Sequence, residues 1–190
     1  MNKLFLLFLP FLLFAWDEYK KIDNITIYKE HNKKFEFVQF KADTVFAFSL
    51  DEISYTIMNH HSYTSWFSDC IKADKDKNSI YILMQPPWPL EKRQVWAEIK
   101  KKVYDKKQII TLSSTSKKNS DYEGIWFNYL YAEFKLEYIS EHSTKVSLSL
   151  MGDPGGYPPS WIINLMAWKI PYQTLNNLNI YLINAEQIYR

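Results

Sequence analysis

The feature of this sequence that most constrains its fold is a change of hydrophobic period close to Pro159. Before that point, apolar and polar residues alternate in several stretches between short polar turns, as in 145–151, and alternation is typical of a strand with one buried face. After it, large apolar residues recur at helical spacing: Trp161, Leu165, Trp168, Tyr172, Leu175 and Leu182. Short turns between successive strands favour antiparallel pairing. The sequence therefore predicts an α+β fold in which one long C-terminal helix follows an antiparallel sheet.

The predicted sheet has about seven strands, because seven stretches carry the strand period: 22–28, 35–40, 79–85, 94–104, 108–114, 125–138 and 145–151. Two short helices are expected after the early strands. Ser49 begins the first as a capping residue with Glu52 three positions on, and the second is expected within 59–66. A large sheet curls through its own twist. We therefore expect a helix-grip fold, with the curved sheet wrapped around the long helix and an apolar cavity between them.

The chain begins with the pattern of an export signal. Lys3 precedes an apolar run from Leu4 to Ala15, which is too short for a membrane span and is interrupted by Pro10. We interpret residues 1–15 as a signal peptide and 16–190 as a single domain, located in a periplasm or secreted. The alternative is that the leader stays uncleaved as a membrane anchor.

Charge and cysteine content exclude several classes of protein. The 23 basic and 21 acidic residues leave a formal charge of +2, which gives no electrostatic field to attract nucleic acid. Cys70 is the only cysteine, so no disulfide forms within the chain and no metal site can rest on thiolates. The sequence predicts a monomer without metal or cofactor.

The stretch MGDPGGYPPSWIINL, residues 151–165, holds three of the four glycines and three of the eight prolines of the chain. Its spacing matches neither of the common phosphate-binding loops. Gly155 and Gly156 are instead expected to take positive φ, so that the chain reverses after the last strand. We interpret the pair as the hinge of a lid.

Four segments resemble the signatures of bacterial START-domain proteins, within the Bet v 1-like helix-grip superfamily. They are PPWPLEKRQVW (86–96), GDPGGYPPSWIINL (152–165), PYQTLNNLNIYL (171–182) and YTSWFSDC (63–70). The resemblance implies that the domain binds one lipid or other hydrophobic molecule in an internal tunnel, with the C-terminal helix and a neighbouring loop as its lid. It also implies a carrier or sensor and not an enzyme. One departure is Gln94, which stands where the family usually has an aspartate after Arg93 and so removes an expected ion-pair partner.

Periodicity and the implied fold together give a set of candidate cavity-lining residues: Trp66, Tyr81, Trp96, Phe127, Tyr129, Trp161, Leu165 and Trp168. Arg93 is a candidate polar anchor for a ligand. Lysine clusters at 100–102, 106–107 and 117–118 are candidates for transient contact with an anionic membrane surface.

Two alternatives to a carrier stay open. A helix-grip enzyme acting on a hydrophobic substrate, of the cyclase or hydrolase type, would need titratable groups in the cavity, for which His61, Asp69 and Arg93 are the chief candidates. A protein that only binds partners would have its interior filled by the aromatic residues.

Overall fold

A computed structural model describes residues 16–30, 38–119 and 121–188 of the chain. The predicted signal peptide and the first part of the predicted strand 35–40 lie outside these described residues. Within them, no helix is both long and apolar enough to cross a membrane.

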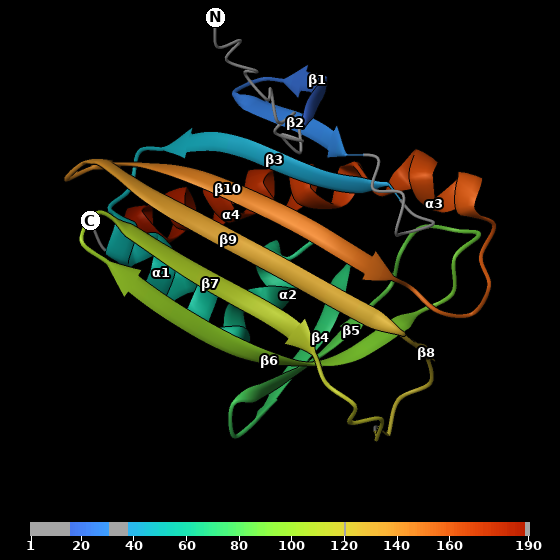
Figure 1. The fold of residues 1–190 in the computed structure, drawn as a ribbon. Coiled ribbons are helices and arrows are strands. Elements are labelled where there is room, and N and C mark those ends of the chain that lie inside the picture. The colour runs from blue at the N-terminus through green and yellow to red at the C-terminus, as the bar shows by residue number, and fades with distance from the viewer. Residues whose placement is uncertain (1–15, 31–37, 120, 189–190) are drawn as a thin grey trace, which may run out of the picture.

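The described residues form one large sheet of ten strands, which confirms the predicted antiparallel architecture and exceeds the predicted strand number (Figure 1). The strands are β1 (Asp17–Ile22), β2 (Ile25–Glu30), β3 (Gln39–Phe46), β4 (Cys70–Asp76), β5 (Ser79–Met84), β6 (Arg93–Tyr104), β7 (Lys107–Ser114), β8 (Ile125–Trp126), β9 (Tyr129–Ser140) and β10 (Ser143–Asp153). Their order is β1-β2-β3-β10-β9-β7-β6-β5-β4, and β8 pairs in parallel with β6. The strands that the sequence pattern missed are β1 and β4, which are both largely exposed.

The helices lie on one face of the sheet (Figure 1). They are α1 (Leu50–Met58), α2 (Tyr63–Trp66), α3 (Ser160–Met166) and α4 (Lys169–Ile188), with a 3-10 turn over His60–Ser62. The predicted capping box is present: Ser49 Oγ accepts from the Glu52 amide at 3.3 Å, and the Glu52 carboxylate accepts from the Ser49 amide at 2.8 Å. Helix α4 packs on β2, β3, β10 and α2, while α1 packs on β7 and β9.

The core lies between α4 and the inner face of the sheet. Leu175, Leu178 and Leu182 of α4 are buried against apolar residues of β2, β3 and β10. At the other side of α4, Trp66 of α2 packs edge-on against Phe134 of β9, with ring centroids 6.1 Å apart. These contacts hold the long helix within the curve of the sheet, as the predicted helix-grip fold requires.

The predicted C-terminal helix is in fact two helices, because it breaks at residues 167–168. Pro171 explains the break: proline lacks an amide hydrogen, and its ring clashes with the carbonyl of the residue four positions earlier, here Ala167. Proline is tolerated in the first turn of a helix, and α4 accordingly begins at Lys169.

The predicted strand 125–138 is also two strands, β8 and β9. Residues 125–126 pair with β6, whereas β9 pairs with β7 and β10, so the chain crosses from one neighbour to another at Phe127 and Asn128. Asn128 secures the crossing, because its amide N–H donates to the Asp153 carbonyl at 3.0 Å and its side chain donates to the Asp153 carboxylate at 3.1 Å. The alternation of side chains between the two faces of the sheet is therefore not continuous from β8 to β9.

Candidate ligand-binding cavity

A cavity of about 130 Å³ lies between α3, the start of α4 and the adjoining end of the sheet. Its wall is mostly apolar. The apolar side chains that line it are Val38, Phe40, Phe67, Met84, Pro86, Leu90, Phe127, Leu130, Leu150, Met151, Pro154, Ile163, Met166, Ala167 and Ile170. Three of the four segments that carry the family resemblance, 63–70, 86–96 and 152–165, contribute residues to this wall.

Helix α3 turns one face to the cavity. Ile163, Met166 and Ala167 follow one another at helical spacing and line it, together with Ile170 in the first turn of α4. The opposite face of α3 carries Trp161 and Leu165, whose side chains are exposed. The prediction that Trp161 and Leu165 line the cavity is therefore wrong. The helical period of the sequence is equally consistent with the opposite face, which carries Ile163 and Met166.

The cavity wall contains three polar residues, Ser68, Asp69 and Arg93. Ser68 ties the end of α2 to α4, since its amide donates to Thr174 Oγ1 at 3.2 Å and its hydroxyl donates to Gln173 Oε1 at 3.0 Å. Burial raises the pKa of the Asp69 carboxyl, and a hydrogen bond with Ser68 opposes this shift. An otherwise apolar wall thus has a polar side close to β4, β5 and β6.

Arg93 is the most deeply buried of the charged groups on this wall, with 5% of the residue exposed. Its Nη1 donates to the carbonyls of Glu91 at 2.8 Å and Lys92 at 3.4 Å, and its Nε has no partner among the described residues. Burial lowers the pKa of the guanidinium. The candidate polar anchor therefore does reach the cavity.

Of the eight aromatic and apolar candidates, Phe127 lines the cavity and the others do not. Trp66 belongs to the core, where its Nε1 donates to Ser62 Oγ at 2.8 Å. Tyr129 is partly exposed at the start of β9. Trp168 packs against Tyr19 of β1, with ring centroids 6.4 Å apart.

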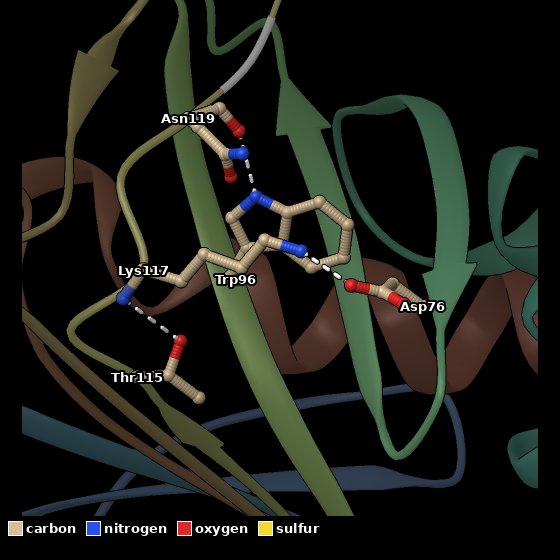
Figure 2. Close-up of polar contacts among 5 residues, drawn as sticks. All are labelled: Asp76, Trp96, Thr115, Lys117 and Asn119. Carbon is tan, nitrogen blue, oxygen red and sulfur yellow. Dashed lines mark hydrogen bonds and ion pairs between the residues drawn. The ribbon is translucent and has the colours of Figure 1, made fainter.

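Tyr81 and Trp96 lie on the outer face of the sheet, which corrects their predicted place in the cavity. Their rings are 5.4 Å apart, and Tyr81 donates a 2.8 Å hydrogen bond to Gln94. Figure 2 shows how Trp96 is held there: its Nε1 donates to the Asn119 carbonyl at 2.9 Å, and Lys117 covers its ring. The ammonium of Lys117 lies 3.6 Å from the ring centroid and 2.6 Å from the Asp76 carboxylate. These interactions make Trp96 a structural residue of the outer surface.

Few titratable groups reach the cavity. Asp69 and Arg93 line it, whereas His61 does not. The ring of His61 lies tilted against that of His60, with the ring centroids 3.9 Å apart. Burial is the main cause of a lowered pKa at His60. Within the described ranges, no three His, Cys, Asp or Glu residues cluster as metal ligands would. The expected absence of an enzymatic activity, a cofactor and a metal stays a prediction.

The glycine pair adopts the predicted backbone. Gly155 has φ +67° and Gly156 has φ +70°, and the Gly155 amide donates to Asp153 Oδ1 at 2.9 Å. This reversal leads from β10 into the loop before α3. Helix α3 is thus bounded by the glycine pair on one side and by the break at 167–168 on the other.

The fold is that of START-domain proteins. A StAR-related lipid transfer protein from Xanthomonas axonopodis matches with a TM-score of 0.78 at 17% identity, over 88% of this chain and 98% of that one. Human StAR-related lipid transfer protein 5 matches with a TM-score of 0.79 at 9% identity, over 92% of this chain and 88% of that one. Human STARD10 matches with a TM-score of 0.76 at 13% identity, over 90% and 74%. No family model and no curated protein matches the sequence.

Proposed function

We propose that this chain binds a lipid or another hydrophobic small molecule in the cavity between α3, α4 and the sheet, and that it does so outside the cytoplasm as an exported protein. The observation that carries the proposal is the apolar wall of that cavity, set in a fold shared with lipid transfer proteins. Apolar surface buried from water contributes roughly 25 cal/mol per Å², so a hydrophobic ligand gains affinity from such a wall. The apolar leader supports export.

The size of the cavity indicates how a lipid would enter. About 130 Å³ is close to the roughly 150 Å³ of an engineered cavity that holds a benzene molecule, so an acyl chain or a sterol needs more room. Helix α3 is the element whose movement would most readily enlarge the cavity. None of its residues is fully buried, and a 3.0 Å hydrogen bond to its Asn164 Oδ1 comes from the amide of Val38, the residue before β3. We infer that α3 swings about Gly155–Gly156 and residues 167–168 as a lid.

Exposed apolar side chains surround this lid. Trp88 is 91% exposed in the loop between β5 and β6, Tyr157 is fully exposed after the glycine pair, and Trp161 and Leu165 of α3 are 68% and 62% exposed. The loop that carries Trp88 and helix α3 lie at the same end of the sheet (Figure 1). Tryptophan and tyrosine favour the membrane interface, so this end is suited to transient contact with a bilayer from which a lipid is taken.

The predicted lysine clusters are less suited to that contact. Lys100 lies seven residues beyond Arg93 on β6, which is about 23 Å at the rise of a strand, and it pairs with Glu98 at 2.7 Å. Lys117 is engaged with Asp76 and Trp96. We therefore propose that apolar residues next to the cavity, and not these lysines, make the membrane contact.

The binding proposal is tested by native mass spectrometry of the exported protein, with extraction of whatever co-purifies, and by uptake of fluorescent lipids and sterols. An Ala167→Phe variant, which places a ring in the cavity wall, is expected to lose binding. Leu165→Phe, on the exposed face of α3, is the matched control and should bind normally. Repeated recovery of an empty protein that takes up none of the probes would refute the proposal.

The membrane contact is tested separately by co-sedimentation with phosphatidylcholine vesicles. A Trp88→Ala, Trp161→Ala double variant should lose most of its vesicle binding. Tyr55→Ala removes a side chain that is 74% exposed on α1, away from the cavity, and should have no effect. Equal loss in both proteins would contradict the proposed contact surface.

A further inference from the structure

One charged group on the cavity wall, Arg93, has no ion-pair partner among the described residues. Arg93 lies on the inner side of β6, where its register partner on β5 is Met84, another residue of the cavity wall. The two acceptors that it has, the carbonyls of Glu91 and Lys92, are both neutral. Its Nε is buried without a partner, and no carboxylate among the described residues forms an ion pair with it.

A buried guanidinium in this state is unfavourable. Arginine keeps its charge even when burial lowers its pKa, because the ordinary pKa of a guanidinium lies far above neutral pH. A buried charge becomes tolerable when an opposite charge and further hydrogen bonds compensate it. The planar guanidinium is well matched to the two oxygens of a carboxylate or a phosphate. The cavity therefore has a donor that an anionic group would satisfy.

The charged neighbours of Arg93 do not supply that group. Asp69 is the other ionisable residue of the wall, but it makes no ion pair with Arg93, and burial shifts its carboxyl toward the neutral form. Glu91 is exposed, and it is the backbone carbonyl of Glu91 that contacts the guanidinium. Gln94, where the resembling family has an aspartate, is turned to the outer face and pairs with Tyr81.

We propose that the natural ligand of the cavity is an anionic amphiphile, whose acidic head accepts hydrogen bonds from the Arg93 guanidinium and whose apolar chain lies against Phe127, Leu130 and Leu150. The inference rests on the proposed function of the cavity and adds the charge of the ligand to it. A carboxylate and a monoester phosphate share the required chemistry. A fatty acid is the simplest molecule of this class.

The test compares two probes that share one acyl chain, one ending in an ionised carboxylate and the other in a neutral methyl ester. Cis-parinaric acid and its methyl ester are titrated into the purified full chain at pH 7.5, with probe fluorescence as the readout. The acid is expected to bind at least tenfold more tightly than the ester. Arg93→Gln should remove this preference by weakening the acid and leaving the ester nearly unchanged, and Arg93→Lys should retain part of it.

Lys92→Gln is the matched control, because it removes the same charge from an exposed neighbouring position. It should keep the preference for the acid. Displacement of the bound acid by dodecanoic acid, dodecyl phosphate and dodecanol identifies the head group: the proposal expects one or both anions to compete at least tenfold better than the alcohol. Competition by the carboxylate alone assigns a carboxylate, and competition by both assigns the shared anionic chemistry.

The possible failures are distinguishable. Equal affinity of the wild type for acid and ester, or equal loss of both in Arg93→Gln, overturns the anionic ligand and leaves lipid binding intact. Binding of none of the probes, charged or neutral, overturns the proposed function itself. If Arg93→Gln does not fold, as judged by circular dichroism, the comparison of acid with ester in the wild type decides the question.

Discussion

Replacement of Gly155 by alanine should destabilise the protein more than the same replacement at Gly156. Both residues have positive φ, where an ordinary side chain is strained by roughly 1–2 kcal/mol. They differ in what a new Cβ would meet. At Gly155 the Cβ overlaps the backbone carbonyl oxygen of Trp126. At Gly156 it meets side-chain atoms of Ile125 instead, 2.7 Å from Cδ1 and 3.0 Å from Cγ2, and a side chain shifts more readily than backbone.

The difference between the two variants follows from these contacts. Displacing the Trp126 carbonyl disturbs β8, which is tied to β6 by hydrogen bonds from Ile125 N to Lys92 O at 2.9 Å and from Phe127 N to Gln94 O at 3.0 Å. Two such bonds contribute about 2 kcal/mol together. We therefore expect a loss of about 3–4 kcal/mol in unfolding free energy for Gly155→Ala and about 1–2 kcal/mol for Gly156→Ala. The smaller entropy of the unfolded chain with alanine offsets part of each loss equally.

The assay is urea denaturation followed by tryptophan fluorescence, with Ile125→Ala as a third change. Truncation of Ile125 removes the obstacle at Gly156, so the Gly156→Ala, Ile125→Ala pair should be less destabilised than the sum of the single variants. No such rescue is expected for Gly155→Ala, because its obstacle is backbone. Equal losses at the two glycines, or rescue of Gly155→Ala by Ile125→Ala, would refute the reasoning.

Three further predictions concern other parts of the fold. Phe134→Ala empties a fully buried site and should lower the unfolding free energy by about 3–5 kcal/mol in denaturation experiments, so an unchanged midpoint would contradict the packing. Ser49→Ala should lower it by about 1 kcal/mol at neutral pH. The hydrogen bonds of Ser49 lower the pKa of Glu52, so the stability that they contribute is present above the ordinary Glu pKa of 4.5 and is lost as pH falls. A difference in unfolding free energy between wild type and variant that widens in acid would contradict this. Burial raises the pKa of Cys70 to about 11, so Ellman's reagent at pH 8 should label the thiol only after unfolding, and rapid labelling of the native protein would count against the structure.

Features that depend on local sequence were predictable. The capping box at Ser49 involves residues three positions apart, and the positive φ of Gly155 and Gly156 follows from the chemistry of a turn. The break before α4 was predictable in principle, because Pro171 forbids a regular helix through Ala167. Helical spacing alone does not reveal this break, because the apolar residues before and after it keep nearly the same period.

The cavity could not be located from any one segment. Its wall combines the ends of β3 and β10, the loop between β5 and β6, and helix α3, which are brought together only by the pairing of the sheet. The crossing at Phe127 and Asn128 also hid the true alternation, so that Phe127 faces the cavity while Tyr129 is partly exposed. Three of the segments that resemble known sequences contribute to the cavity wall, but a resemblance does not give the face on which each side chain lies.

Strand geometry nevertheless decides between two of the sequence-based candidates. Arg93 and Trp96 are three residues apart on β6, and residues separated by an odd number on a strand point to opposite faces, so both could not line the same cavity. The register with β5 settles which one does. Trp96 pairs with Tyr81 on the outer face, and Arg93 pairs with Met84 on the cavity wall. The alternation of β6 therefore places Arg93 among apolar side chains on the inner face and Trp96 on the outer face. The charge of Arg93 is thus the polar feature of β6 that a ligand in this cavity would meet.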